Sequence, residues 1–202
     1  VYKYYMKILA VQNRMGIGDT VIFLPFIKAL SEKFNSPISL LVKENSKADQ
    51  YLFQTSYIDK ILILERNSKT NDRHNGLLGS LSLIMDIKKH NFDKIIIFNS
   101  SLRFNIIAKL SGIPEIYQYP LFQKTKQHIT DTPKKFLKEK LNIDVNEDPE
   151  IQIEDSIILQ TKEKLLIKED ETNILLGIGG SGPTKRIPAK TFLNVMEKLL
   201  KI

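Results

Sequence analysis

Short apolar runs recur along this chain and are separated by amphipathic segments. Most of the runs lack the polar alternation of a strand with one solvated face, so they predict strands buried on both faces of a parallel sheet. Polar or turn residues bound each run. The predicted strands comprise residues 7–12, 38–42, 60–64, 94–98 and 173–179.

The segments between these runs predict helices, because their apolar residues recur every three or four positions. Alternation of strand and helix is typical of a doubly wound α/β fold with a parallel sheet, which is the fold class that we predict. Three segments show the helical spacing: Phe23, Phe26, Ile27, Leu30 and Phe34; Leu77, Leu81 and Ile84; and Ile106, Ile107 and Leu110.

The pattern divides the chain into two domains of similar plan. We predict a Rossmann-like first domain over residues 6–141, with Met6 as the native start. Residues 142–155 are acidic, carry a proline and predict a linker. Residues 156–202 include a second succession of strand, glycine loop and helix. Because one strand and one helix cannot form a domain core, we interpret this segment as the start of a truncated second domain.

The first predicted strand leads into the sequence MGIGDTVIFLP, which contains Gly16 and Gly18. The dinucleotide-binding fingerprint requires a third glycine where the chain has Val21, and Asp19 would repel a pyrophosphate. A nicotinamide-dependent oxidoreductase is therefore disfavoured. One interpretation of Asp19 is that it caps a helix that starts just before Pro25, and spacing alone favours this interpretation. The alternative is a functional carboxylate, because Asp19 lies where open α/β sheets bind ligands.

The second glycine loop, GIGGSGPTKRIP, has the outline of an anion site. Its glycines free the backbone N–H groups to turn toward a ligand, and Lys185 and Arg186 add positive charge, so a diphosphate is the expected ligand. The loop is not a Walker A motif, because Lys185 follows Thr184 where that motif requires glycine. An ordinary glycine-rich surface turn with two solvated cations is the alternative.

Composition and charge narrow the function classes. The 202 residues carry a net charge of +7 and include no cysteine, which excludes disulfides and cysteine-ligated zinc. The three histidines are scattered and no acidic cluster has metal-ligand spacing, so we expect no metal. No apolar run reaches the roughly 18 residues of a membrane span, and a cytoplasmic protein is expected. The lysines of residues 124–140 suit a polyanion or a solvated helix face. Aromatic residues do not interleave with the basic ones as they would on a platform that binds single-stranded nucleic acid.

Three segments together resemble glycosyltransferase family 9, the lipopolysaccharide heptosyltransferases. They are MKILAVQNRMGIGDTVIFLPFIKALSEKF, FDKIIIFNSSLRFNIIAKLSGIPEIYQY and ILLGIGGSGPTKRIPAKTF, in that order along the chain. The resemblance implies a GT-B fold, in which an acceptor-binding N-terminal domain faces a donor-binding C-terminal domain, both Rossmann-like. It also implies an inverting transfer of heptose from a nucleotide-diphosphate sugar, usually ADP-heptose, to the lipopolysaccharide core.

The resemblance assigns roles to residues of the first domain. Asp19 matches the aspartate that acts as general base on the acceptor hydroxyl. Gly16 and Gly18 match glycines that let the acceptor approach, and Arg103, in SSLRFN, matches a basic residue on the acceptor side.

The same resemblance assigns the donor site to the second glycine loop. Lys185 matches the lysine that binds the donor diphosphate, and Gly179, Gly180 and Ser181 match the loop beside the phosphates. The donor sugar is a substrate, and no cofactor is implied. Enzymes of this kind work without metal, using dipoles and basic side chains.

The expected partners are a nucleotide-sugar donor and a lipid-linked glycan acceptor, with no nucleic acid. The lysine-rich segment suits peripheral contact with anionic lipids of the cytoplasmic leaflet of the inner membrane. A non-catalytic sugar-nucleotide or glycan-binding module, or an inactive fragment of such an enzyme, remains the alternative function.

Overall fold

The computed structural model describes residues 6–14, 16–66, 72–121, 128–179 and 186–200. The chain divides into two compact units, Val1–Glu154 and Asp155–Ile202. The first unit contains the whole sheet, and each unit is described here by itself.

The first unit is built on a five-stranded parallel sheet. Its spatial order is β3-β2-β1-β4-β5. Four strands coincide with predicted apolar runs, and the α/β fold class predicted from the sequence is confirmed. The strands are β1 (Ile8–Gln12), β2 (Ile38–Lys43), β3 (Ile58–Leu64), β4 (Lys94–Ile97) and β5 (Glu115–Gln118).

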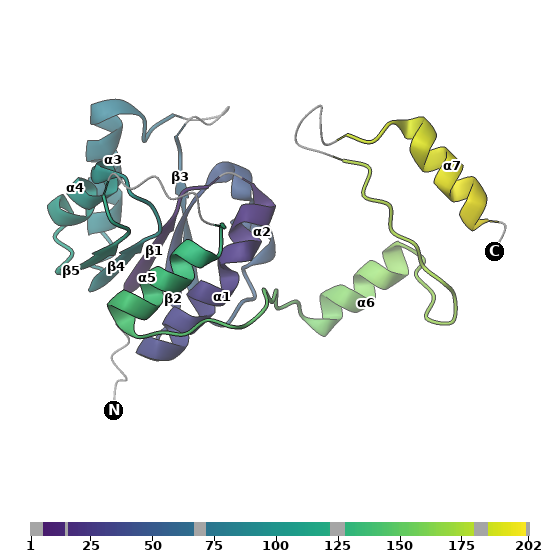
Figure 1. Ribbon diagram of the computed structural model, residues 1–202, viewed down its shortest axis with the longest axis horizontal. Helices are drawn as coiled ribbons and strands as arrows, with labels where there is room; N and C mark the ends of the chain where they lie inside the picture. Colours follow the sequence, from purple (N-terminus) through teal and green to yellow (C-terminus); the bar gives the residue numbers. More distant parts are fainter. Residues whose placement is uncertain (1–5, 15, 67–71, 122–127, 180–185, 201–202) are drawn as a thin grey trace. The chain divides into compact units, whose positions relative to one another are not determined.

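Helices cover both faces of the sheet (Figure 1). Helices α1 and α5 pack on one face, and α3 and α4 pack on the other. A 3-10 turn η1 and the short helix α2 follow β2. The bounds of these elements are α1 (Ile17–Phe34), η1 (Glu44–Ser46), α2 (Ala48–Tyr51), α3 (Gly76–Lys88), α4 (Leu102–Leu110) and α5 (Asp131–Leu141).

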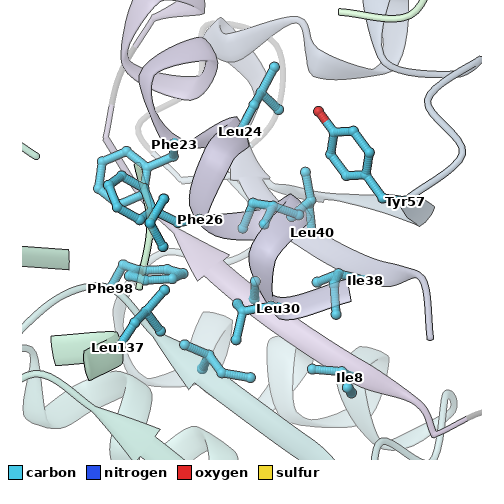
Figure 2. Packing of buried hydrophobic residues seen from close by; sticks show 14 of the residues in the cluster. Ile8, Phe23, Leu24, Phe26, Leu30, Ile38, Leu40, Tyr57, Phe98 and Leu137 are labelled. Atoms are coloured by element: carbon cyan, nitrogen blue, oxygen red, sulfur yellow. The ribbon is translucent and has the colours of Figure 1, made fainter. Parts of the chain in front are cut away.

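The core on the α1 face combines aliphatic side chains with a group of aromatic rings. Figure 2 shows the Phe23 and Phe26 side chains of α1 close to Phe98, which follows β4. The ring centroid of Phe23 lies 5.5 Å from that of Phe26 and 5.4 Å from that of Phe98, both in edge-on geometry. Aromatic pairs favour this geometry, so the cluster ties α1 firmly to the end of β4.

Pro25 differs from its expected position. It is buried in the interior of α1, eight residues after the first helical residue, whereas the sequence predicted it near a helix start. A proline here removes one backbone hydrogen bond. Its ring is buried on the apolar face of α1, and that burial offsets part of the lost bond.

Helices α3 and α4 carry apolar residues on two sides. Leu83 and Ile87 of α3 and Ile107 of α4 are buried against the sheet. Leu77 and Leu81, whose spacing helped to predict α3, are instead 89% and 54% exposed. The pattern therefore predicted the helix correctly while marking an apolar face that points away from the sheet.

The predicted linker lies along the first unit as far as residue 154. It contains no helix or strand between residues 142 and 154, yet Ile143 is buried in the core on the α1 face. The Tyr57 hydroxyl donates a hydrogen bond to the Glu150 carbonyl oxygen at 3.0 Å. These contacts fasten the segment to the domain that precedes it.

The second unit contains helices α6 (Asp155–Lys164) and α7 (Ala189–Leu199). The prediction of a buried strand over residues 173–179 is wrong: these residues form neither helix nor strand, and Leu175 is 97% exposed. A parallel strand is held by hydrogen bonds from its neighbours. The described residues of this unit provide no neighbouring strand.

Gly79 of α3 gives a first prediction. A Cβ atom at this position would lie 2.3 Å from the backbone carbonyl carbon of His74, closer than atoms can pack. We expect Gly79→Ala to destabilise the protein by about 1–3 kcal/mol through overpacking, measured by denaturant unfolding. Ser82→Ala, in the same helix, is the control and should change stability by less than about 0.5 kcal/mol. Equal stabilities of the two variants would contradict the packing described here.

Candidate functional site

The sheet has a topological switch point between β1 and β4. The chain leaves β1 to form α1 on one face and leaves β4 to form α4 on the opposite face, although the two strands are hydrogen-bonded neighbours. The two connections therefore diverge at the carboxyl ends of the strands. Open α/β sheets bind ligands in the crevice that this divergence creates.

A cavity of about 310 Å³ occupies this end of the sheet. Two of its lining residues, Asn99 and Tyr119, carry a buried polar atom, Nδ2 and the hydroxyl respectively, that has no hydrogen-bond partner in the described part of the chain. Burial raises the pKa of Tyr119, so its hydroxyl stays protonated and can donate. The lining residues follow β1, β4 and β5, or lie just before or at the start of α5: Asn13, Arg14, Phe98, Asn99, Ser100, Tyr119, Ile129 and Thr132.

Gln12, the last residue of β1, fixes the connection between β1 and α1. Its side-chain Nε2 donates to the backbone oxygen of Asp19 at 3.1 Å, and its Oε1 accepts from the backbone N–H of Arg14 at 3.1 Å. The residue is only 2% exposed. Sequence reasoning missed this role, although a glutamine that ends a buried apolar run was a visible signal.

Gly16 is the N-cap residue of α1. Its φ of 105° lies in the region that favours glycine, so another residue here would be strained. A Cβ built on Gly16 would contact the Asp19 carboxylate, 3.6 Å from Oδ2. The glycine thus allows the tight turn and keeps one side of the carboxylate open.

Asp19 is the third residue of α1, in its first turn, and makes no capping hydrogen bond. The interpretation of Asp19 as the cap is therefore wrong, because Gly16 occupies that position. Among the described residues, no hydrogen bond or ion pair joins the partly exposed Asp19 carboxylate to another group. The positive end of α1 stabilises its charge. A partly exposed carboxylate at the switch point of a sheet can accept a proton from a bound hydroxyl.

The structure brings together only some of the predicted acceptor residues. Gly16, Gly18 and Asp19 share the first turn of α1, and a Cβ on Gly18 would meet nothing within 4 Å. None of these three residues lines the cavity beside β1 and β4, and neither does Arg103, in the first turn of α4. Its Nε donates to Ser80 Oγ at 2.9 Å, and it lines a separate cavity between α3 and α4.

A buried histidine organises the segment that Arg103 contacts. The Nδ1 atom of His74 accepts from the backbone N–H of Glu65 at 3.1 Å, so its Nε2 carries the proton that points at Asp86, 3.2 Å away. Partial burial alone would raise the pKa of Asp86, but hydrogen bonds from Lys89, Arg73 and His74 lower it to about 2.

This cluster anchors the start of α3 to β3. A guanidinium nitrogen of Arg103 then donates to the His74 backbone oxygen. The cluster therefore holds Arg103 in place through the backbone.

The predicted donor loop is described only in part. Gly179 is exposed and lies in neither helix nor strand. Gly180, Ser181 and Lys185 lie outside the described residues, so their role stays a prediction. In the described ranges no three His, Cys, Asp or Glu side chains gather as metal ligands, and no helix is long and apolar enough to span a bilayer.

The Asp86 cluster predicts a pH dependence of stability. The folded state lowers the pKa of Asp86 from 3.8 to about 2, so its ion pairs stabilise the protein above pH 4, and this contribution is lost as the pH falls from about 4 to 2. Asp86→Asn should cost about 1–2 kcal/mol at pH 7 and converge with the wild type near pH 2. Thermal melts across this pH range measure the difference in stability between the variant and the wild type. The exposed Asp148→Asn is the control. A constant difference at all pH values would contradict the ion-pair assignment.

Comparison with known proteins gives matches at the level of structure. No protein-family model matches the sequence, and no curated protein matches it significantly. A family 9 glycosyl transferase from Veillonella parvula DSM 2008 superposes with a TM-score of 0.73 at 21% identity, over 98% of this chain and 61% of that one. The Escherichia coli ADP-heptose lps heptosyltransferase II gives a TM-score of 0.67 at 14% identity, over 97% and 62% of the two chains.

A third match is the E. coli heptosyltransferase WaaC, solved with ADP-2-deoxy-2-fluoro heptose. It gives a TM-score of 0.60 at 11% identity, over 96% of this chain and 65% of that one. The chain thus spans just over three fifths of the length of these structures. At such identities the likeness concerns the fold, and the fold of this chain is similar to that of family 9 glycosyltransferases, as its three motifs predicted.

Proposed function

We propose that the chain belongs to an inverting glycosyltransferase that moves a heptose or a related sugar from a nucleotide-diphosphate sugar, such as ADP-heptose, to a lipopolysaccharide core or a similar glycan. The observation that carries this proposal is the accessible Asp19 carboxylate in the first turn of α1, at the switch point of the sheet. Asp19 belongs to the same β1–α1 connection as Asn13 and Arg14, which line the polar cavity. The solved structures with similar folds support the reaction class.

The acceptor sugar occupies the cavity in this proposal. The Asn99 Nδ2 atom and the Tyr119 hydroxyl, which have no hydrogen-bond partner among the described residues, bind its hydroxyl groups in this proposal and replace the water that a sugar loses on binding. Gly16 and Gly18 place no side chain between the acceptor and Asp19. The reacting hydroxyl can then approach the carboxylate directly.

The reaction is a single displacement. The acceptor oxygen forms a bond to the anomeric carbon as the bond from that carbon to the diphosphate oxygen breaks, which inverts the configuration. The proton of the hydroxyl passes to the Asp19 carboxylate, and the bonding electrons leave with the nucleotide diphosphate.

The donor diphosphate is assigned to the second glycine loop. Backbone N–H groups near Gly179 and Gly180, the Ser181 hydroxyl and the Lys185 ammonium suit the charge that develops on the leaving group. The proposal calls for no metal or other cofactor.

The cell's inner membrane is the proposed place of action. A lipid-linked acceptor requires an enzyme at the cytoplasmic face, and helix α5 exposes a row of lysines that anionic lipids attract. These residues are Lys134, Lys135, Lys138 and Lys140. Nucleic acid is not a proposed partner.

Asp19→Asn tests the role of the base. Asparagine cannot accept the proton, so turnover in the full-length protein should fall by ~10²–10⁴. Stability should change by less than about 1 kcal/mol, because only the interaction with the helix N-terminus is lost. Transfer from ADP-heptose, detected by mass spectrometry, and a thermal melt provide the two measurements.

Asp49→Asn is the matched control, since Asp49 also lies in the first turn of a helix, α2, and is exposed. This variant should keep wild-type turnover. Near-normal turnover of Asp19→Asn would refute the assignment of the base. A wild-type protein that binds donor and glycan without transfer would be a non-catalytic binding module.

A further inference from the structure

Helices α3 and α4 present an apolar face that the sheet does not use. The side chains on this face are large and aliphatic, and most of them are at least half exposed. Helices that cover a sheet normally direct such residues inward, and an exposed apolar patch marks a binding surface. The residues are Leu77 (89% exposed), Leu78 (80%), Leu81 (54%), Leu102 (43%), Ile106 (46%) and Leu110 (59%).

These residues line a groove of about 620 Å³ between the two helices, which we call the α3–α4 groove. Both helices follow parallel strands, so their N-termini lie at the same edge of the sheet. Arg66, after β3, and Arg103, in the first turn of α4, line the groove at that edge. Leu110, the last residue of α4, lies at the other end, about 12 Å along the helix from Leu102.

The arginine end of the groove concentrates positive charge. The Nε atom of Arg66 and the Nη1 atom of Arg103 are buried without hydrogen-bond partners, and neither guanidinium pairs with a carboxylate in the described part of the chain. Burial, and then the charge of Arg66, lower the pKa of Arg103. The N-termini of α3 and α4 add positive potential at the same place. An anion bound there would offset the repulsion between the two arginines.

We propose that the α3–α4 groove binds a membrane lipid with an anionic headgroup. The headgroup pairs with Arg66 and Arg103, and an acyl chain lies along the leucine and isoleucine side chains toward Leu110. One end that is cationic and one that is apolar complement the two parts of this ligand. A second copy of the chain fits less well, because no residue that lines the groove is acidic, so an identical face offers no counter-charge.

This inference deepens the membrane contact proposed above and rests on it. The two proposals differ in the kind of contact. The groove would bind one lipid molecule at a defined site, whereas the lysines of α5 provide only a diffuse charge. The test reads lipid binding alone, so it does not depend on sugar transfer.

Fluorescence at a single site tests the groove directly, because the chain has no cysteine of its own. Leu81→Cys places an environment-sensitive dye in the groove, and Phe53→Cys places it on a surface outside the groove with similar exposure, 65% against 54%. With vesicles of phosphatidylcholine and phosphatidylglycerol at low salt, the emission of the dye in the groove should shift to the blue, and that of the dye outside it should not. Vesicles of phosphatidylcholine alone should give no shift. No shift of the groove dye with the anionic vesicles would overturn the proposal.

Substitutions in the unlabelled protein distinguish vesicle binding through the groove from vesicle binding through other surfaces. The pair Leu77→Asp with Ile106→Asp should lower the vesicle partition coefficient by ~10-fold or more, and Phe53→Asp by less than ~2-fold. Arg66→Gln should lower it by ~5-fold, and the exposed Lys33→Gln by less than ~2-fold. Circular dichroism checks that each variant is folded.

Two results would overturn the inference. Loss of vesicle binding only when α5 lysines are neutralised would leave the membrane contact in place and exclude the groove. A wild-type dimer that Leu77→Asp with Ile106→Asp converts to a monomer, with no vesicle binding in either form, would identify the occupant as a second copy.

Discussion

Strand β1 is the constraint on which the arrangement of the first unit depends. All five of its residues are buried, and it pairs with β2 on one side and β4 on the other. Ile8 and Ala10 belong to the core under α1 and α5, whereas Leu9 and Val11 belong to the core under α3 and α4. One strand therefore contributes to both layers. It also begins the connection that ends at Asp19.

The position of β1 separates two chemically different sites. The crevice beside β1 and β4 collects polar groups, because loops there carry residues that are not required for packing. Its Asn99 and Tyr119 have unsatisfied polar atoms that suit sugar hydroxyls. The α3–α4 groove is apolar along its length and cationic at one end. A transferase with a lipid-linked acceptor has to bind both a sugar and a lipid. In the proposed function, Asp19 acts on the sugar and Arg103 helps to bind the membrane lipid.

Four of the five strands were predictable because a continuous apolar run has few alternatives to a buried parallel strand. Strand β5, Glu115–Gln118, was missed because it is short, partly exposed and not a continuous apolar run. The same rule failed for residues 173–179, since a run becomes a strand only where a neighbour can pair with it. Helices were found by their period, but the period of α3 could not tell which of two apolar faces packs on the sheet. Leu83 and Ile87 do so, while Leu77 faces out.

The site was predictable where its residues are adjacent in the sequence. Gly16, Gly18 and Asp19 share a motif, although the sequence could not show that Gly16, with its positive φ, takes the cap position from Asp19. The proximity of Arg66 and Arg103 escaped prediction, because the fold brings together a residue that follows β3 and a residue of α4, which no local pattern connects.

The most direct test of this account is a crystal structure of the full-length protein with a lipopolysaccharide-core oligosaccharide. The account predicts a sugar hydroxyl within hydrogen-bond distance of the Asp19 carboxylate, with neighbouring hydroxyls bound by Asn99 and Tyr119. An oligosaccharide bound elsewhere, with the crevice beside β1 and β4 left to solvent, would contradict the assignment of the acceptor site and of its base.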